Sequence, residues 1–159
     1  MPIRHVVIRA KGHPNILAQH ENTLEITKDP EVTPRGTCIV ACSADKALAD
    51  LDEEFVNALK RDDSIVVVKI CVNSECDFVL CQGSKLLRPS NSRKIIIRKS
   101  TYIDDATLCI RSNKAAKDID RRLINKICLG SDVTIELYVI TLDELEKMTK
   151  VGFYSDKAD

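Results

Sequence analysis

Two stretches of this sequence repeat one pattern. Ala44–Ile70 reads ADKALADLDEEFVNALKRDDSIVVVKI, and Ser112–Tyr138 reads SNKAAKDIDRRLINKICLGSDVTIELY. They align without a gap, and the identical pairs are Lys46/Lys114, Ala47/Ala115, Asp50/Asp118, Asp52/Asp120 and Asn57/Asn125. In both, apolar residues recur at helical spacing up to Leu59 and Ile127, and then at every second residue, as in a strand. Because chance does not preserve both periods and the change between them, we interpret the repeat as an internal duplication.

The segments before each stretch extend the repeat. Apolar patterns predict strands over 23–28 and 37–42 before the first stretch, and over 94–100 and 106–111 before the second. Each repeat, about 23–72 and about 94–140, is therefore predicted to be strand, strand, helix, strand. Further strands are predicted at 5–9 and 75–82, and a short final helix over 141–148.

Strands outnumber helices in this prediction, so the expected fold is mainly β. Two β-β-α-β units are expected to form a pseudo-twofold β-barrel or a jelly-roll-like sandwich with short helices. A ferredoxin-like sandwich is disfavoured because it needs longer helices. A chain of 159 residues is expected to form a single domain over residues 1–159.

An aspartate is expected to begin the helix of each repeat. Asp50, with Glu53 three residues later, matches a capping box, in which each side chain accepts a backbone hydrogen bond of the first turn. Asp118 takes the same place in the second repeat, where Arg121 replaces the glutamate, so only the cap recurs.

The cysteines indicate a reducing compartment. Their number is seven, which is odd, and most lie inside apolar, strand-like runs, so we expect free thiols that pack as small hydrophobic residues. No C-x-x-C pair is present, and neither a metal nor another cofactor is expected. The chain has no apolar run near the length of a membrane span and no secretion signal, which predicts a cytoplasmic protein without membrane contact.

Charge is distributed unevenly along the chain, although the net charge is zero. Residues 21–63 hold eleven acidic and five basic residues, whereas residues 85–126 hold twelve basic and four acidic ones. The basic segment begins with Lys85, Arg88, Arg93, Lys94, Arg98 and Lys99, with no acidic residue between Asp77 and Asp104. Such a cluster can neutralise phosphates, which predicts a binding site for an anion or a nucleic acid. The alternative is a solvated strand and loop, because only Tyr102 in this segment would stack on a base.

The loops that open the two stretches are a second candidate site. Asp45 and Lys46 in the first correspond to Asn113 and Lys114 in the second. Polar loop residues often serve local hydrogen bonds, which favours a structural role. The alternative is a pair of symmetric loops that face a shared ligand.

The histidines offer a third candidate site. His5, His13 and His20 lie in the first twenty residues, with Glu21 and Glu25 close by in sequence. Imidazole and carboxylate groups suit acid–base or metal chemistry, although the loose spacing favours turn and surface roles. Signatures of serine hydrolases and of phosphate-binding loops are missing. The sequence therefore leaves open whether the protein is an enzyme.

Four motifs of the chain resemble an uncharacterised archaeal family of unknown function, the DUF371-like proteins. The motifs are TPRGTCIV (33–40), ADKALADL (44–51), IRKS (97–100) and NKAAKDI (113–119), and the likeness extends from about Gly12 to Val139. The resemblance implies a mainly β, jelly-roll-like or barrel fold in a cytoplasmic archaeal protein. It implies no activity and no catalytic residue.

These observations favour a binding module for an anionic partner such as RNA or single-stranded nucleic acid. Two alternatives stay open. One is a small-molecule enzyme that uses histidine and carboxylate groups. The other is a self-associating scaffold, a homo-oligomer in which the acidic half of one copy contacts the basic half of another.

Overall fold

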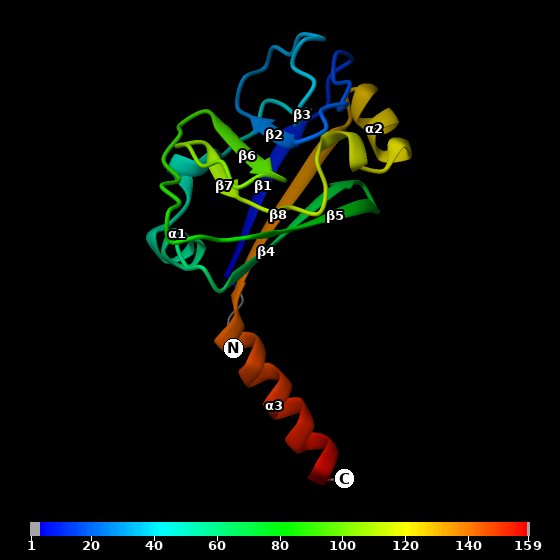
Figure 1. Ribbon diagram of the computed structural model, residues 1–159. Helices are drawn as coiled ribbons and strands as arrows, with labels where there is room; N and C mark the ends of the chain where they lie inside the picture. The colour runs from blue at the N-terminus through cyan, green and yellow to red at the C-terminus, as the bar shows by residue number, and fades with distance from the viewer. Residues whose placement is uncertain (1–3, 159) are drawn as a thin grey trace.

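A computed structural model describes residues 4–158 of the chain, with side chains up to residue 150. Within these residues the strands form two four-stranded sheets (Figure 1). Sheet A has the order β1–β8–β4–β5 and is antiparallel throughout. Its strands are β1 (Arg4–Lys11), β4 (Ser64–Val72), β5 (Glu75–Gln82) and β8 (Asp132–Thr141).

Sheet B has the order β3–β2–β6–β7. Its central pair, β2 (Thr23–Thr27) and β6 (Lys94–Arg98), is antiparallel, and the outer strands β3 (Ile39–Ala41) and β7 (Thr107–Cys109) join it in parallel. The two sheets approach each other at isolated bridges, Lys11 with Cys42 and Gln82 with Ile110. Single bridges do not close the sheets. The mainly β prediction is confirmed, and the structure has two open sheets rather than a closed barrel.

The helices are short except for the last. A 3₁₀ turn η1 (Leu48–Asp50) precedes α1 (Glu53–Leu59), and η2 (Ala116–Asp118) precedes α2 (Arg121–Cys128). In Figure 1, α1 and α2 lie on opposite sides of the sheets, whereas α3 (Leu142–Ala158) projects away from them. Among the described residues, none of the helices is both long enough and apolar enough to cross a bilayer.

The core lies between the sheets. The inward residues of sheet A include Val66, Val68 and Ile135, and each is fully buried. Phe55 of α1 and Leu123 of α2 complete this cluster from the two sides. Alternation along each strand follows from the pleat, which points successive side chains to opposite faces.

The gap-free alignment of the two repeats is wrong in the last strand. It pairs Ile65 with Val133, yet Ile65 is half-buried on the outer face of sheet A, whereas Val133 is buried on the inner face. The connection from α1 to β4 is residues 60–63, and the connection from α2 to β8 is only 129–131. One missing residue reverses the face of every side chain in a strand. Gly130, at φ +86°, makes the shorter turn.

The predicted helix caps are also wrong by two residues. Asp52 caps α1, since its Oδ1 accepts the backbone N–H of Phe55 at 2.8 Å, and Asp120 caps α2. Asp50 and Asp118 instead end the preceding 3₁₀ turns. Both aspartates of each Asp-x-Asp sequence are residues that favour a cap. Because the 3₁₀ turn ends at the first aspartate, the second one caps the α-helix.

The last helix begins as predicted and ends later than predicted. Thr141 and Glu144 form the expected capping box, with the Thr141 N–H donated to Glu144 Oε1 at 3.1 Å. The helix then continues to Ala158 instead of ending near Met148.

The expectation of seven free cysteines is wrong for four of them. Cys71 is bonded to Cys76, and Cys81 is bonded to Cys109. The β4–β5 pairing sets Cys71 opposite Cys76. The bridge between Gln82 and Ile110 brings their neighbours Cys81 and Cys109 together. Cys38, Cys42 and Cys128 have free thiols.

Candidate functional site

The predicted basic cluster gathers around β6. Lys94 and Arg98 lie on the strand itself, Arg93 and Lys99 flank it, and Lys85 and Arg88 lie in the preceding loop. The structure thus places two of the first four side chains at each end of β6, so the six do not converge on one spot.

Much of this positive charge is neutralised inside the protein. Arg93 is paired with Asp29. Lys99 Nζ lies 2.7 Å from Asp118 Oδ2. Arg98 Nη2 lies 3.0 Å from Asp104 Oδ2, and its side chain is only 12% exposed. In the described part of the chain, only Lys85, Arg88 and Lys94 of this cluster have no carboxylate within ion-pair distance. The cluster is therefore weaker as an anion site than its sequence indicates.

The first residues of the paired loops hold the edge strands of sheet A. Asp45 Oδ1 accepts the backbone N–H of Arg9 on β1 at 3.0 Å. Asn113 Oδ1 accepts the backbone N–H of Leu80 on β5 at 2.9 Å. In return, the backbone N–H of Asp45 donates a hydrogen bond to the carbonyl oxygen of Arg9, and that of Asn113 donates to the carbonyl oxygen of Leu80.

The loop lysines bind the same two edge strands, but through different groups. Lys46 Nζ donates to the carbonyl oxygen of Val7 at 2.8 Å. Lys114 Nζ donates to Asp77 Oδ1 at 2.6 Å. Burial alone raises the pKa of Asp77, yet the hydrogen bonds that it accepts, first from Lys114, outweigh burial and hold this pKa below its usual value. All these contacts favour the structural role of the loops.

The structure does not bring the histidines together. His13 Nδ1 accepts the N–H of Asn15, and His20 Nδ1 accepts the N–H of Asn22, so each closes its own turn. His5 lies on β1. Within the described residues, no three His, Cys, Asp or Glu side chains gather where they could hold a metal ion. The predicted histidine–carboxylate site therefore has no geometric support.

Glu25 is the one buried carboxyl group near that predicted site. It is 7% exposed on β2, and burial raises its pKa. Its Oε1 lies 3.7 Å from the thiol of Cys38, whose pKa burial also raises. A raised pKa keeps the thiol protonated, so this pair does not provide a reactive thiolate.

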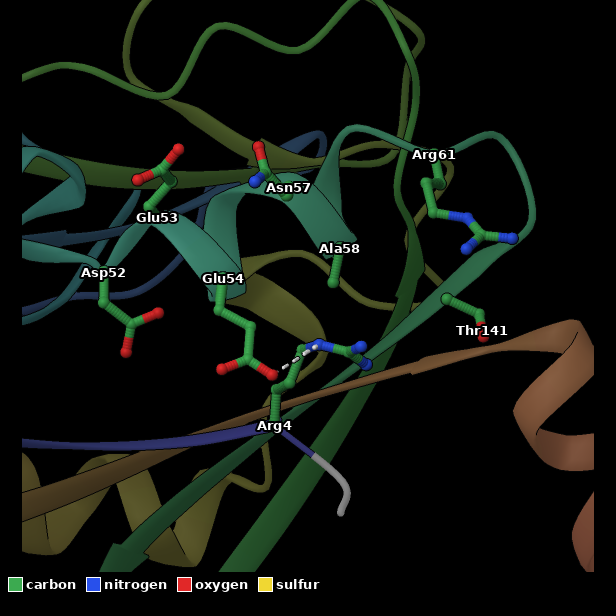
Figure 2. Close-up of a pocket in the computed structure, with 8 residues that line it drawn as sticks. All are labelled: Arg4, Asp52, Glu53, Glu54, Asn57, Ala58, Arg61 and Thr141. Atoms are coloured by element: carbon green, nitrogen blue, oxygen red, sulfur yellow. Dashed lines mark ion pairs between the residues drawn. The ribbon is translucent and has the colours of Figure 1, made fainter. Parts of the chain in front are cut away.

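An open hollow of about 600 Å³ lies beside α1 (Figure 2). Most of its charged groups already have partners within the described residues. Arg4 Nη1 lies 2.8 Å from Glu144 Oε1, and Arg4 points toward Glu54. Arg61 is paired with Asp63, and Asp52 caps the helix. Among residues 4–150, no convergent set of unpartnered groups lines the hollow, and we assign no chemistry to it.

The outer face of sheet A is the surface that sequence reasoning missed. Phe78 and Leu80 of β5 are 49% and 48% exposed. The alternation of burial places Val67 and Tyr138 beside them on the same face, both half-buried. Exposed apolar and aromatic side chains that lie side by side on a protein surface often mark a binding site.

Five side chains link all four strands across this face. This sheet-face cluster consists of His5, Lys69, Phe78, Glu136 and Tyr138. The rings of His5 and Tyr138 stack with centroids 4.5 Å apart and planes 6° apart. Glu136 lies between His5 Nε2 at 3.4 Å and Lys69 Nζ at 3.5 Å. Lys69 Nζ in turn lies 6.0 Å from the centre of the Phe78 ring.

The sequence contains one signal for this face. Ile65–Val68 is a continuous apolar run, whereas a half-buried strand alternates apolar and polar residues. Such a run predicts apolar side chains on both faces of β4. Without the strand order, nothing in the sequence identifies the other strands that contribute.

The fold and this surface define a two-sheet β protein with an open, aromatic sheet face. Comparison with known proteins then assigns the family. The chain belongs to the family described as "Domain of unknown function (DUF371)", whose model matches residues 8–140. It is similar to "Uncharacterized protein MJ0206" of Methanocaldococcus jannaschii, with 41% identity over 133 residues, which cover 84% of this chain and 98% of the relative. The predicted family is thus confirmed, and α3 lies beyond the matched residues.

Proposed function

We propose that the protein is a binding module for single-stranded nucleic acid, RNA in the first place, and that bases stack on the outer face of sheet A. The observation that carries the proposal is an open antiparallel sheet with Phe78 and the stacked rings of His5 and Tyr138 on its outer face. Aromatic residues on an exposed four-stranded sheet are one established way to bind unpaired bases.

The charges of this face suit a nucleotide chain. Arg9 and Lys11 are exposed at the end of β1, and their alternation places them on the outer face. Lys69 lies at the centre of the sheet, beside the Phe78 ring. These cations are within reach of a backbone whose bases stack on the aromatic residues, and stacking tolerates any base sequence. We therefore expect little sequence preference.

The predicted basic cluster has a secondary role in this proposal. Lys85, Arg88 and Lys94 are available to a phosphate on a longer strand, whereas Arg93, Arg98 and Lys99 support the fold through their carboxylate partners. Removal of the first three should weaken binding without loss of stability.

Fluorescence anisotropy with a labelled single-stranded RNA tests the proposal. Phe78→Ala should weaken binding about tenfold, because stacking contributes about 1–3 kcal/mol per base. Tyr102→Ala is the matched control, since Tyr102 is an aromatic residue that is 61% exposed outside sheet A. No binding at low salt, or equal losses in the two variants, would contradict the proposal.

The salt dependence provides a second measure. If Arg9 and Lys11, which have no carboxylate partner among the described residues, each contact one phosphate, the logarithm of affinity should fall with the logarithm of salt concentration with a slope of about −1.4. A flat response would exclude phosphate contacts.

Self-association through the same face is the second candidate function. Its supporting observation is the apolar content of the face, to which Ile65, Ile140 and Leu80 contribute. Sedimentation of the protein over a range of concentrations distinguishes the two. A monomer at all concentrations excludes self-association, whereas a dimer that Phe78→Lys dissociates would favour it over nucleic-acid binding.

We also infer that the two halves arose by duplication. Pairs of contacts recur at aligned positions, such as Lys28–Asp50 with Lys99–Asp118, each at 2.7 Å. Superposition of 23–70 on 94–137, with three residues of the first, longer strand–strand loop and one residue before β4 omitted, tests this inference. A lack of common backbone geometry would contradict it.

A further inference from the structure

The two disulfides differ in how far water reaches them. Cys81 and Cys109 are only 3% and 0% exposed, whereas Cys76 is an exposed residue next to a hairpin turn. Cys71, its partner, is 9% exposed. We propose that the Cys71–Cys76 disulfide is a thiol-exchange site, at which a low-molecular-mass thiol forms a mixed disulfide with Cys76. Exposed disulfides are more labile than buried ones. This inference does not depend on the proposed nucleic-acid binding.

The position of the bond lets it open without unfolding the protein. Cys71 and Cys76 face each other across β4 and β5. The backbone pairing of these strands, which extends from Cys71↔Cys76 to Ile65↔Gln82, holds the hairpin together without the disulfide. The bond closes a loop with a sequence separation of 5, compared with 28 for Cys81–Cys109. A shorter loop restrains the unfolded chain less, so its loss costs less stability.

The buried disulfide has a different task. Cys81 lies on β5 of sheet A and Cys109 on β7 of sheet B, so their bond cross-links the two sheets. A thiol cannot reach either sulfur unless the sheets separate. The same chain therefore contains one structural disulfide and one accessible disulfide, and each serves as the control for the other.

The exchange balances with two equivalents of thiol. The thiolate of the small thiol attacks Sγ of Cys76, and the bond to Cys71 breaks. Cys71 leaves as a thiolate with the bonding electron pair and takes a proton from water. A second thiol attacks the mixed disulfide, which releases Cys76 as a thiol and joins the two small thiols as their disulfide. The small thiols lose the two electrons that the two cysteines gain.

A glutathione redox titration of the full-length, folded protein tests the proposal. The protein is equilibrated in mixtures of reduced and oxidised glutathione, alkylated, and digested for mass spectrometry. We expect Cys71 and Cys76 to be half-reduced in mixtures at least about tenfold less reducing than those needed for Cys81 and Cys109. The circular dichroism spectrum should not change over that first step. The proposal is overturned if the two disulfides titrate together, if reduction coincides with unfolding, or if Cys71 and Cys76 never pair.

Single-cysteine variants identify the attacked sulfur. Cys71→Ser leaves Cys76 as a free thiol, and Cys76→Ser leaves Cys71. With oxidised glutathione, the adduct on Cys76 should form at least about tenfold faster than the adduct on Cys71, because access limits exchange. Equal rates, or a faster reaction at Cys71, would overturn the assignment of Cys76.

Discussion

Lys99 Nζ lies 2.7 Å from Asp118 Oδ2, and this ion pair fastens the residue after β6 to the end of the second 3₁₀ turn. Asp118 also accepts the backbone N–H of Ala115 at 2.9 Å. In the first half, Lys28 and Asp50 form the same pair at 2.7 Å. One carboxylate in each half thus connects sheet B to the turn that leads into a helix.

Replacement of Asp118 by asparagine should lower stability at neutral pH and not at acid pH. The hydrogen bond from Lys99, followed by that from Ala115, lowers the pKa of Asp118 in the folded protein. The stabilisation is therefore present above the unfolded-state pKa and is lost as pH falls through the lower, folded-state value. We expect Asp118→Asn to cost about 1 kcal/mol near neutral pH, since the carboxylate is half-buried and water still screens its ion pair. Urea unfolding over a pH series measures this difference.

Asp132→Asn is the control for this series, because Asp132 is an exposed carboxylate for which the described residues provide no ion pair. Its effect on stability should be small at every pH. If Asp118→Asn costs as much at acid pH as at neutral pH, the charge of Asp118 has no part in its contribution.

In the structure, Asp52 and Asp120 cap α1 and α2. Asp52→Ala should lower the free energy of unfolding by about 1 kcal/mol, because the N–H of Phe55 loses its acceptor at the first turn. Glu53→Ala, at the next position, removes no capping bond and should have a smaller effect. Thermal unfolding of the two variants provides the comparison, and equal losses would contradict the cap assignment.

Local patterns in the sequence were sufficient to predict most strands. The predicted limits of β5, residues 75–82, agree with the structure at both ends, because this strand lies between clear turn residues. The helix starts were predicted two residues too early, since Asp50 and Asp52 both suit a cap. The face of β4 that is exposed could not be predicted, because Ile65–Val68 is apolar at every position.

The sheet-face cluster and the disulfides needed information that no local pattern contains. His5 and Tyr138 stack because β1 pairs with β8, which joins the two ends of the chain. Cys81 and Cys109 bond because one bridge connects the edges of the two sheets. Both arrangements depend on strand order and register, which are set by the packing of the whole core.

Gly12 and Gly83 should not tolerate a side chain. A methyl group on Gly12 would overlap the carbonyl oxygen of Ile127, and one on Gly83 would overlap that of Leu59. These carbonyls belong to the last turns of α2 and α1, so the backbone itself would have to move. We expect Gly12→Ala and Gly83→Ala each to cost about 2 kcal/mol or more, as overpacking does. Chemical denaturation measures the loss.

Gly36→Ala is the matched control for these two substitutions. An added methyl group there meets the flexible end of the Ile39 side chain at 3.0 Å rather than a backbone oxygen. Its cost should be smaller than either of the others. A similar loss in all three variants would show that close helix contact is not the cause.

The two loop lysines should contribute unequally to stability. Lys114 donates to Asp77, a carboxylate whose side chain is 15% exposed, whereas Lys46 donates to the neutral carbonyl group of Val7. Hydrogen bonds to charged groups are stronger than those to neutral ones, so Lys114→Ala should lower the melting temperature more than Lys46→Ala.

Asp77→Ala should cost more than either lysine substitution, about 2 kcal/mol, because it removes the acceptor for Lys114 and for the backbone N–H of Asp120. A double-mutant cycle of Asp77→Ala and Lys114→Ala, measured by urea unfolding, should give a coupling energy of about 1 kcal/mol or more. The single lysine variants should bind RNA as the wild type does, since both lysines are engaged within the fold. Zero coupling together with a loss of RNA binding would instead assign these lysines to a ligand.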